Sequence, residues 1–125
     1  MHFEFTDAEV AACTWQQGRL QLRFSAARVV VPRYLQDEVA WAPVVLSAEG
    51  VEPWEPPTPA MEAGRLCQGW VLHDSQRMQQ LAVPCQLQGP STVELALAQG
   101  GLLRFRCHSL VVHPIEGAGV AAYQC

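Results

Sequence analysis

Residues 92–107 read TVELALAQGGLLRFRC, in which two runs of alternating apolar and polar side chains flank a pair of glycines. A period of two places the apolar side chains of a strand on one face. Glycine supplies the positive φ that a tight turn between two strands requires. The stretch therefore predicts a β-hairpin with one buried face, and Leu95 is predicted to lie in the core.

Residues 9–24 show the same pattern around Gln17-Gly18, which predicts a second hairpin with Leu22 in the core. Helical periodicity is confined to two short segments, near 34–38 and 75–80, each predicted as a helical turn. The Pro-rich residues 53–64 are predicted to form a loop, because proline lacks the donor that a strand ladder needs. Further strands are predicted near 27–31, 39–48, 66–73, 80–87, 109–113 and 119–124.

These elements predict a single β domain over residues 1–125. The expected class is all-β, an antiparallel barrel or a two-sheet sandwich with at most one or two short helical turns. Half of the residues are hydrophobic and only 16% are charged, so the chain has apolar residues for a core and a surplus for an interface. Strand order, and the choice between barrel and sandwich, stay open at this point.

A weak internal repeat occurs at an offset of 82 residues. Two origins are compatible with it: a duplicated hairpin-plus-strand unit, or chance, since turn glycines and alternating valines occur in any hairpin sequence. The matching residues are Gln17, Gly18, Leu20, Val29, Val30 and Pro32 with Gln99, Gly100, Leu102, Val111, Val112 and Pro114.

Residues 17–27, QGRLQLRFSAA, and residues 93–101, VELALAQGG, resemble hairpins in small uncharacterised bacterial β proteins. The resemblance covers about a third of the chain. It implies the all-β fold class and carries no activity or catalytic residue onto these positions.

Charge and cysteine content narrow the function classes. The formal net charge is -4 and all eight basic residues are arginines, which argues against nucleic-acid binding by phosphate neutralisation. The first residues, MHFEFTD, lack signal-peptide features, and no apolar run approaches the ~20 residues of a membrane span. Five cysteines without a C-x-x-C pair are typical of reduced thiols. We therefore expect a cytoplasmic protein without a membrane or nucleic-acid partner.

The residues that could carry metal or catalytic chemistry lack the required spacings. Four histidines and five cysteines contain no close pair of the kind that binds zinc, and Cys107 and His108 would point to opposite faces of a strand. His73 and Asp74 could form a catalytic pair, but neighbours on a strand also diverge, and Asp74-Ser75 is more typical of a turn or a helix cap. The sequence predicts no metal, no cofactor and no catalytic residue.

The preferred function is a non-catalytic protein-binding or assembly module. Its expected partner is a second copy of the chain in a homodimer, or else another protein. In an open sheet, the uncharged segments 39–46, 110–112 and 119–123 are candidate strand edges, and the chain has no lysine to protect an edge from pairing. Full closure into a barrel is the alternative, and it would remove the edges without a partner.

The alternative is a small-molecule-binding barrel, possibly an enzyme, with a pocket near Trp70, His73, Arg23 and Arg104. Aromatic side chains could line such a pocket if the sheet closes, although packing in the core is their commoner role. The candidates are Trp15, Trp41, Trp54, Trp70, Phe3, Phe5, Tyr34 and Tyr123.

Overall fold

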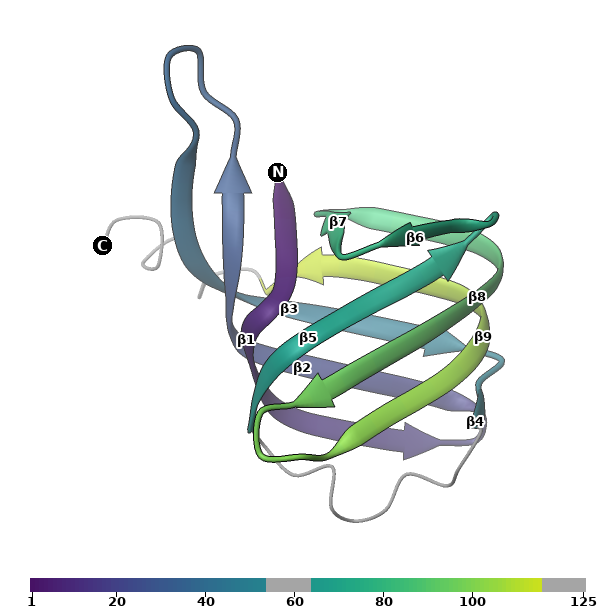
Figure 1. Ribbon diagram of the computed structural model, residues 1–125. Coiled ribbons are helices and arrows are strands. Elements are labelled where there is room, and N and C mark those ends of the chain that lie inside the picture. The colour runs from purple at the N-terminus through teal and green to yellow at the C-terminus, as the bar shows by residue number, and fades with distance from the viewer. Residues whose placement is uncertain (54–63, 116–125) are drawn as a thin grey trace.

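A computed structural model describes residues 1–53 and 64–115 of the chain (Figure 1). In these residues the backbone is almost entirely extended, and neighbouring strands run antiparallel. The strands are β1 (His2–Gln16), β2 (Arg19–Val31), β3 (Glu38–Glu49), β4 (Glu52–Pro53), β5 (Gly64–His73), β6 (Gln76–Met78), β7 (Gln80–Ala82), β8 (Cys85–Leu97) and β9 (Leu102–Pro114).

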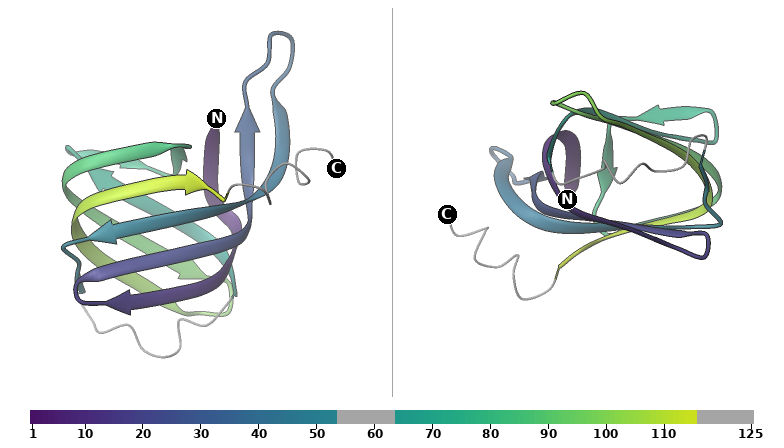
Figure 2. Two further views of the ribbon diagram at one scale, coloured as in Figure 1. Left: turned by 180° about the vertical axis from the view of Figure 1, so that it is seen from behind. Right: turned by 90° about the horizontal axis from the view of Figure 1, so that it is seen from below.

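Six of these strands close into an antiparallel barrel (Figure 2). Their order is β1, β2, β3, β9, β8 and β5, and β5 pairs back onto β1. The short strands β4, β6 and β7 pair with β9, β5 and β1. The all-β prediction is confirmed, and the sheet is a barrel rather than a sandwich. Closure pairs the strand edges that an open sheet of this size would expose.

The two predicted helical turns are wrong. No helix occurs in the described residues; residues 34–38 form an exposed bend running into β3, and residues 75–80 contain β6. Asp74 and Ser75 both have positive φ, 49° and 63°, which makes a tight two-residue turn and lets β6 pair with β5. The predicted strand 80–87 is interrupted at Pro84, which has no N–H for a ladder. The predicted strand 119–124 and most of the loop 53–64 lie outside the described residues.

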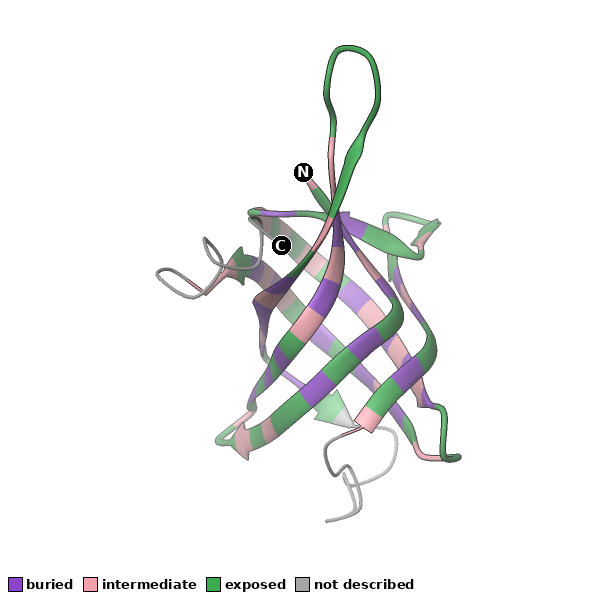
Figure 3. Cartoon of the chain, turned by 90° about the vertical axis from the view of Figure 1, so that its left-hand side faces the viewer, coloured by how far each residue is buried: buried purple, intermediate pink, exposed green. Residues whose placement is uncertain are grey.

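The inward faces of the strands fill the barrel with apolar side chains. Buried positions alternate with exposed ones along the strands (Figure 3). Leu22 and Leu95 are fully buried, as predicted. Phe3 packs on Phe5 and Phe24, with ring centroids 4.8 and 5.8 Å apart. A six-stranded barrel is narrow enough for such side chains to fill its interior. Other large, fully buried side chains are Phe105, Leu20, Leu46, Leu66, Leu110, Val10 and Val29.

The hairpin of β2 and β3 continues beyond the barrel, and we call its residues 26–42 the arm (Figures 1 and 2). Neighbouring irregularities mark where it leaves the barrel. The β1 register shifts around Asp7, whose φ is 67°, the β2 register shifts between Phe24 and Ala27, and β3 contains Pro43. Bulges of this kind bend a sheet. The tip of the arm therefore projects beyond the barrel, whereas its base, with Ala27, Val29 and Ala42, still packs against the core.

The barrel consists of two three-stranded sets, β1-β2-β3 and β5-β8-β9. If one set repeats the other, β2 corresponds to β8, because each is the middle strand of its set. The 82-residue offset instead matches the β1–β2 hairpin with the β8–β9 hairpin. The repeat in the sequence therefore does not follow the order of strands in the barrel.

Candidate functional site: the arm and the groove at its base

Two of the four residues predicted near a ligand pocket lie on the outer face of β5 and β9. The Arg77 guanidinium lies over the ring of Trp70, 4.7 Å from the ring centroid. The Arg104 guanidinium contacts the Glu94 carboxylate at 2.8 Å, and Glu94 on β8 pairs with both Trp70 and Arg104. Charge pairing and ring stacking already engage these side chains.

The other two residues lie elsewhere. His73, at the end of β5, follows the inward alternation of its strand, and its side chain is 14% exposed. Arg23 is on the outer face of β2, which is separated from β5 by β1. The structure therefore does not gather the four residues around one hollow.

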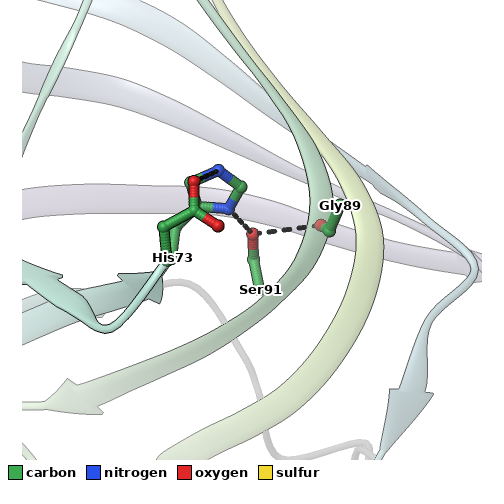
Figure 4. Close-up of polar contacts among 4 residues, drawn as sticks. His73, Gly89 and Ser91 are labelled. Atoms are coloured by element: carbon green, nitrogen blue, oxygen red, sulfur yellow. Dashed lines mark hydrogen bonds and ion pairs between the residues drawn. The ribbon is translucent and has the colours of Figure 1, made fainter.

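His73 takes part in a small polar cluster at one end of the barrel (Figure 4). Its Nδ1 is 2.9 Å from the Ser91 hydroxyl, which donates to the Gly89 carbonyl at 3.4 Å. Its Nε2 is 3.3 Å from an Asp74 carboxylate oxygen. Sequence reasoning expected Asp74 to point away from His73, but the positive φ of Asp74 turns the chain and brings the carboxylate back.

The three side chains form a chain of polar contacts in which Asp74 is exposed and Ser91 is buried. Ser91 is 3% exposed and its hydroxyl has a backbone acceptor, so neither its proton nor its oxygen is presented to a substrate. The described residues also contain no group of three or more His, Cys, Asp or Glu side chains that could hold a metal ion.

The aromatic side chains do not line a common cavity in the described residues. Phe3 and Phe5 fill the core, and Trp15 packs against it. Tyr34 and Trp41 are on the arm and exposed to solvent. Trp54 and Tyr123 lie outside the described residues.

One edge of the arm has unpaired backbone groups. The ladder between β3 and β9 runs from Val44 to Glu49, and the Ile115 N–H then donates to the Pro43 carbonyl at 3.3 Å. Pro43 has no N–H to continue the ladder. Because alternate residues direct their N–H and C=O to the same edge, Val39 and Trp41 direct theirs to this edge too. No strand in residues 1–53 or 64–115 pairs with them there.

The arm also exposes large apolar side chains. Tyr34 and Leu35 at its tip are 97% and 90% exposed, and Val39 and Trp41 along its free edge are 49% and 46% exposed. Exposed apolar residues scattered singly are ordinary, whereas exposed apolar residues beside a strand edge that no described strand pairs favour an interaction surface.

A groove of about 780 Å³ lies at the base of the arm on the outer face of the barrel. Its floor is Val45, which faces outward but is only 8% exposed. Arg23 on β2 and His113 on β9 are its direct neighbours in register. Arg23 forms no ion pair with any other described residue. The lining residues are Gln21, Arg23, Val45, Pro84, His113, Pro114 and Ile115.

Comparison with protein-family models, with curated proteins and with solved structures gave no significant match for this chain. Among the described residues, no helix is long and apolar enough to cross a membrane.

Of the groove residues, sequence reasoning singled out only Arg23 for a ligand site. The groove combines positions from β2, β3, β9 and the segment before β8, so no local pattern could reveal it. Sequence reasoning named Tyr34 only as a candidate aromatic for a pocket, and the tip was not recognised as a surface because Tyr34 and Leu35 fell in a predicted helical turn. The one available signal was the uncharged segment 39–46, which contains the free edge of β3.

Proposed function

We propose that the protein is a non-catalytic assembly module that forms a homodimer through its arm. The observation that carries this proposal is the edge of β3 at Val39 and Trp41, which combines exposed apolar side chains with backbone groups that no strand in residues 1–53 or 64–115 pairs. Pairing of strand edges is a general mode of protein association, and a two-fold dimer is the commonest oligomer of soluble proteins.

The edge is self-complementary, which favours a second copy over a different protein. If two β3 edges pair antiparallel about an axis through Ala40, Val39 lies opposite Trp41 of the second copy, and Glu38 lies opposite Ala42. Aromatic and β-branched side chains make favourable cross-strand pairs, and no like charges meet in this register. A shift of the axis to Trp41 would instead bring Pro43, which lacks an N–H, into the new ladder.

The alternative function, a small-molecule-binding barrel, has less support. Side chains fill the barrel interior, and the four residues expected around a pocket point to different places. A ligand barrel would need an internal cavity with converging polar groups.

A reducing, cytoplasmic location is part of the proposal. Cys13, Cys67, Cys85 and Cys107 are free thiols in the structure. Free thiols persist where the compartment is reducing. A dimer in that compartment would be held by non-covalent contacts.

The experiment is light scattering under reducing conditions across micromolar concentrations, with Cys125→Ser in every sample to exclude disulfide artefacts. We expect a mass twice that of the 13.8 kDa chain. Val39→Lys should give a monomer, because it places a charge against the apolar edge of the second copy. Leu102→Lys is the matched control, since Leu102 is 62% exposed at the β8–β9 turn, away from the arm (Figure 1).

A mass of 13.8 kDa at all concentrations would overturn the proposed homodimer. If Val39→Lys dimerises as tightly as Leu102→Lys, the dimer exists but the arm is not its interface.

A further inference from the structure

We infer that the groove at the base of the arm is the docking site for the tip of the arm of a second copy. The ligand that it would receive is an apolar, acidic peptide tip: Tyr34 and Leu35 with Asp37. This inference rests on the proposed function and adds a specific acceptor site to it.

The geometry of antiparallel pairing brings tip and groove together. When two β3 edges pair about Ala40, the tip of one arm lies beside the base of the other. The added strand occupies the same side of β3 as β9, because both pair with the same edge. Since β9 ends at Pro114, the arriving tip meets Pro114 and Ile115, which line the groove.

The groove is also on the correct face of the sheet. Along β3 the side chains of Ala42 and Val44 point into the core, so those of Trp41 and Val45 point outward. A two-fold axis perpendicular to the sheet keeps the outer faces of both copies on the same side. The tip of one copy therefore approaches the second copy over the face that contains Val45, the floor of the groove.

The chemistry of tip and groove is complementary. The groove offers apolar surface at Val45, Pro84 and Ile115, which can cover apolar side chains of the tip. Arg23 and His113 flank this surface and supply its basic groups. A tip with an acidic group next to its apolar residues suits such a groove, because complementary charges favour the correct register.

The tip has a carboxylate available for this contact. Its Arg33 guanidinium is engaged with the Glu38 carboxylate at 3.3 Å. Asp37 lies between them in the bend and forms no ion pair with any described residue. The partner that we expect for Asp37 is Arg23 of the second copy, which lies on the far, β2 side of Val45 from the edge where the tip enters and forms no ion pair with another described residue.

The exposed aromatic side chains of the arm supply part of the area that a stable dimer buries. Tyr34 is 97% exposed and Trp41 46% exposed, so together they offer about 300 Å² of side-chain surface. Leu35, Val39 and the groove lining add to this in each copy. A standard interface buries about 800 Å² per partner.

The test is charge reversal across the expected pair, with the dimer Kd measured by sedimentation equilibrium. Arg23→Glu and Asp37→Arg should each raise Kd about tenfold or more, because each places like charges in contact. The double variant restores an opposite-charge pair in each contact, so its Kd should return to within a few-fold of the unsubstituted protein. Arg19→Glu is the control, because Arg19 is exposed on the same face of β2 and does not line the groove.

The outcomes separate this inference from the proposed function. If Val39→Lys abolishes the dimer but both charge reversals leave Kd unchanged, or the double variant shows no rescue, the arm forms the interface and the groove is not its acceptor. If the full chain is monomeric and only deletion of residues 116–125 produces a dimer, the chain's own C-terminal segment occupies the edge. That result would overturn both the homodimer and the docking site.

Discussion

Burial in the barrel interior changes the acidity of the Cys107 thiol. Cys107 points inward from β9, is 2% exposed, and burial raises the pKa of its thiol from the ordinary value of 9.0 to about 11. Burial also raises the pKa of Cys13 and Cys85. A thiol that stays protonated is a small apolar group rather than a nucleophile.

The pKa of Cys107 predicts a loss of stability in alkali. In the unfolded chain the thiol ionises near pH 9, whereas in the folded protein it stays protonated to about pH 11. The unfolded state therefore binds fewer protons in this window, and the free energy of unfolding falls as pH rises from 9 to 11. Cys107→Ala should show a shallower fall over the same window, measured by urea unfolding at several pH values. Equal slopes for the two proteins would contradict the prediction.

At the scale of single elements, the turn between β1 and β2 requires an unusual backbone conformation at both of its residues. Gln17 and Gly18 both have positive φ, 52° and 78°, which is the backbone of a type I′ turn. Glycine adopts this conformation readily, whereas glutamine does so at a cost and asparagine at a smaller one. Gln17 is therefore not the best residue for its position.

Substitutions at the two positions of this turn should change the free energy of unfolding in opposite directions. Gln17→Asn should raise the free energy of unfolding by up to about 1 kcal/mol, because asparagine suits the first position of a type I′ turn. Gly18→Ala should lower it by about 1–2 kcal/mol for conformational reasons alone, since a Cβ at Gly18 would meet no atom within 4 Å. Urea unfolding measures both changes. Gln88→Asn on exposed β8 is the control, and an equal gain there would refute the turn argument.

At the scale of the whole molecule, the barrel wall is not equally strong all round. Among the described residues, the β1–β5 contact that closes it contains two residue pairs, Glu9 with Arg65 and Val10 with Gly64. The β8–β9 ladder contains a pair at almost every residue from Cys85 to Ala96. An ion pair between Asp7 and Arg65 also spans the seam, but at 3.9 Å and on the surface it adds little.

We therefore predict that the barrel opens first along the β1–β5 seam. Hydrogen exchange measured by mass spectrometry should show faster exchange in peptides covering 9–10 and 64–66 than in peptides covering 20–24 and 44–48, because local opening follows the weakest pairing. The seam does not include the free edge of the arm, so Val39→Lys should leave this contrast unchanged. Protection at the seam equal to that of the β2–β3 ladder would contradict the prediction.

The sequence alone determined the all-β class, the two hairpin turns and the buried positions of Leu22 and Leu95. These features follow from alternation with a period of two and from glycine in tight turns, and both act over a few residues. The same local reasoning assigned residues 75–80 to a helical turn, where pairing with β5 instead selects β6. Of the four residues expected at a ligand site, only Arg23 lines the groove.

The tertiary structure alone decided closure, the arm and the groove. Closure depends on β1–β5 and β3–β9 pairings between segments far apart in the chain, and nothing in either segment specifies its partner. Within the described residues the ladder of β3 with β9 runs only from Glu49 to Val44, with one further bond from Ile115 to the Pro43 carbonyl, so Val39 and Trp41 lie beyond it. The groove exists because that register places Arg23 and His113 on either side of Val45, and side chains on three different strands become neighbours only once their strands have paired.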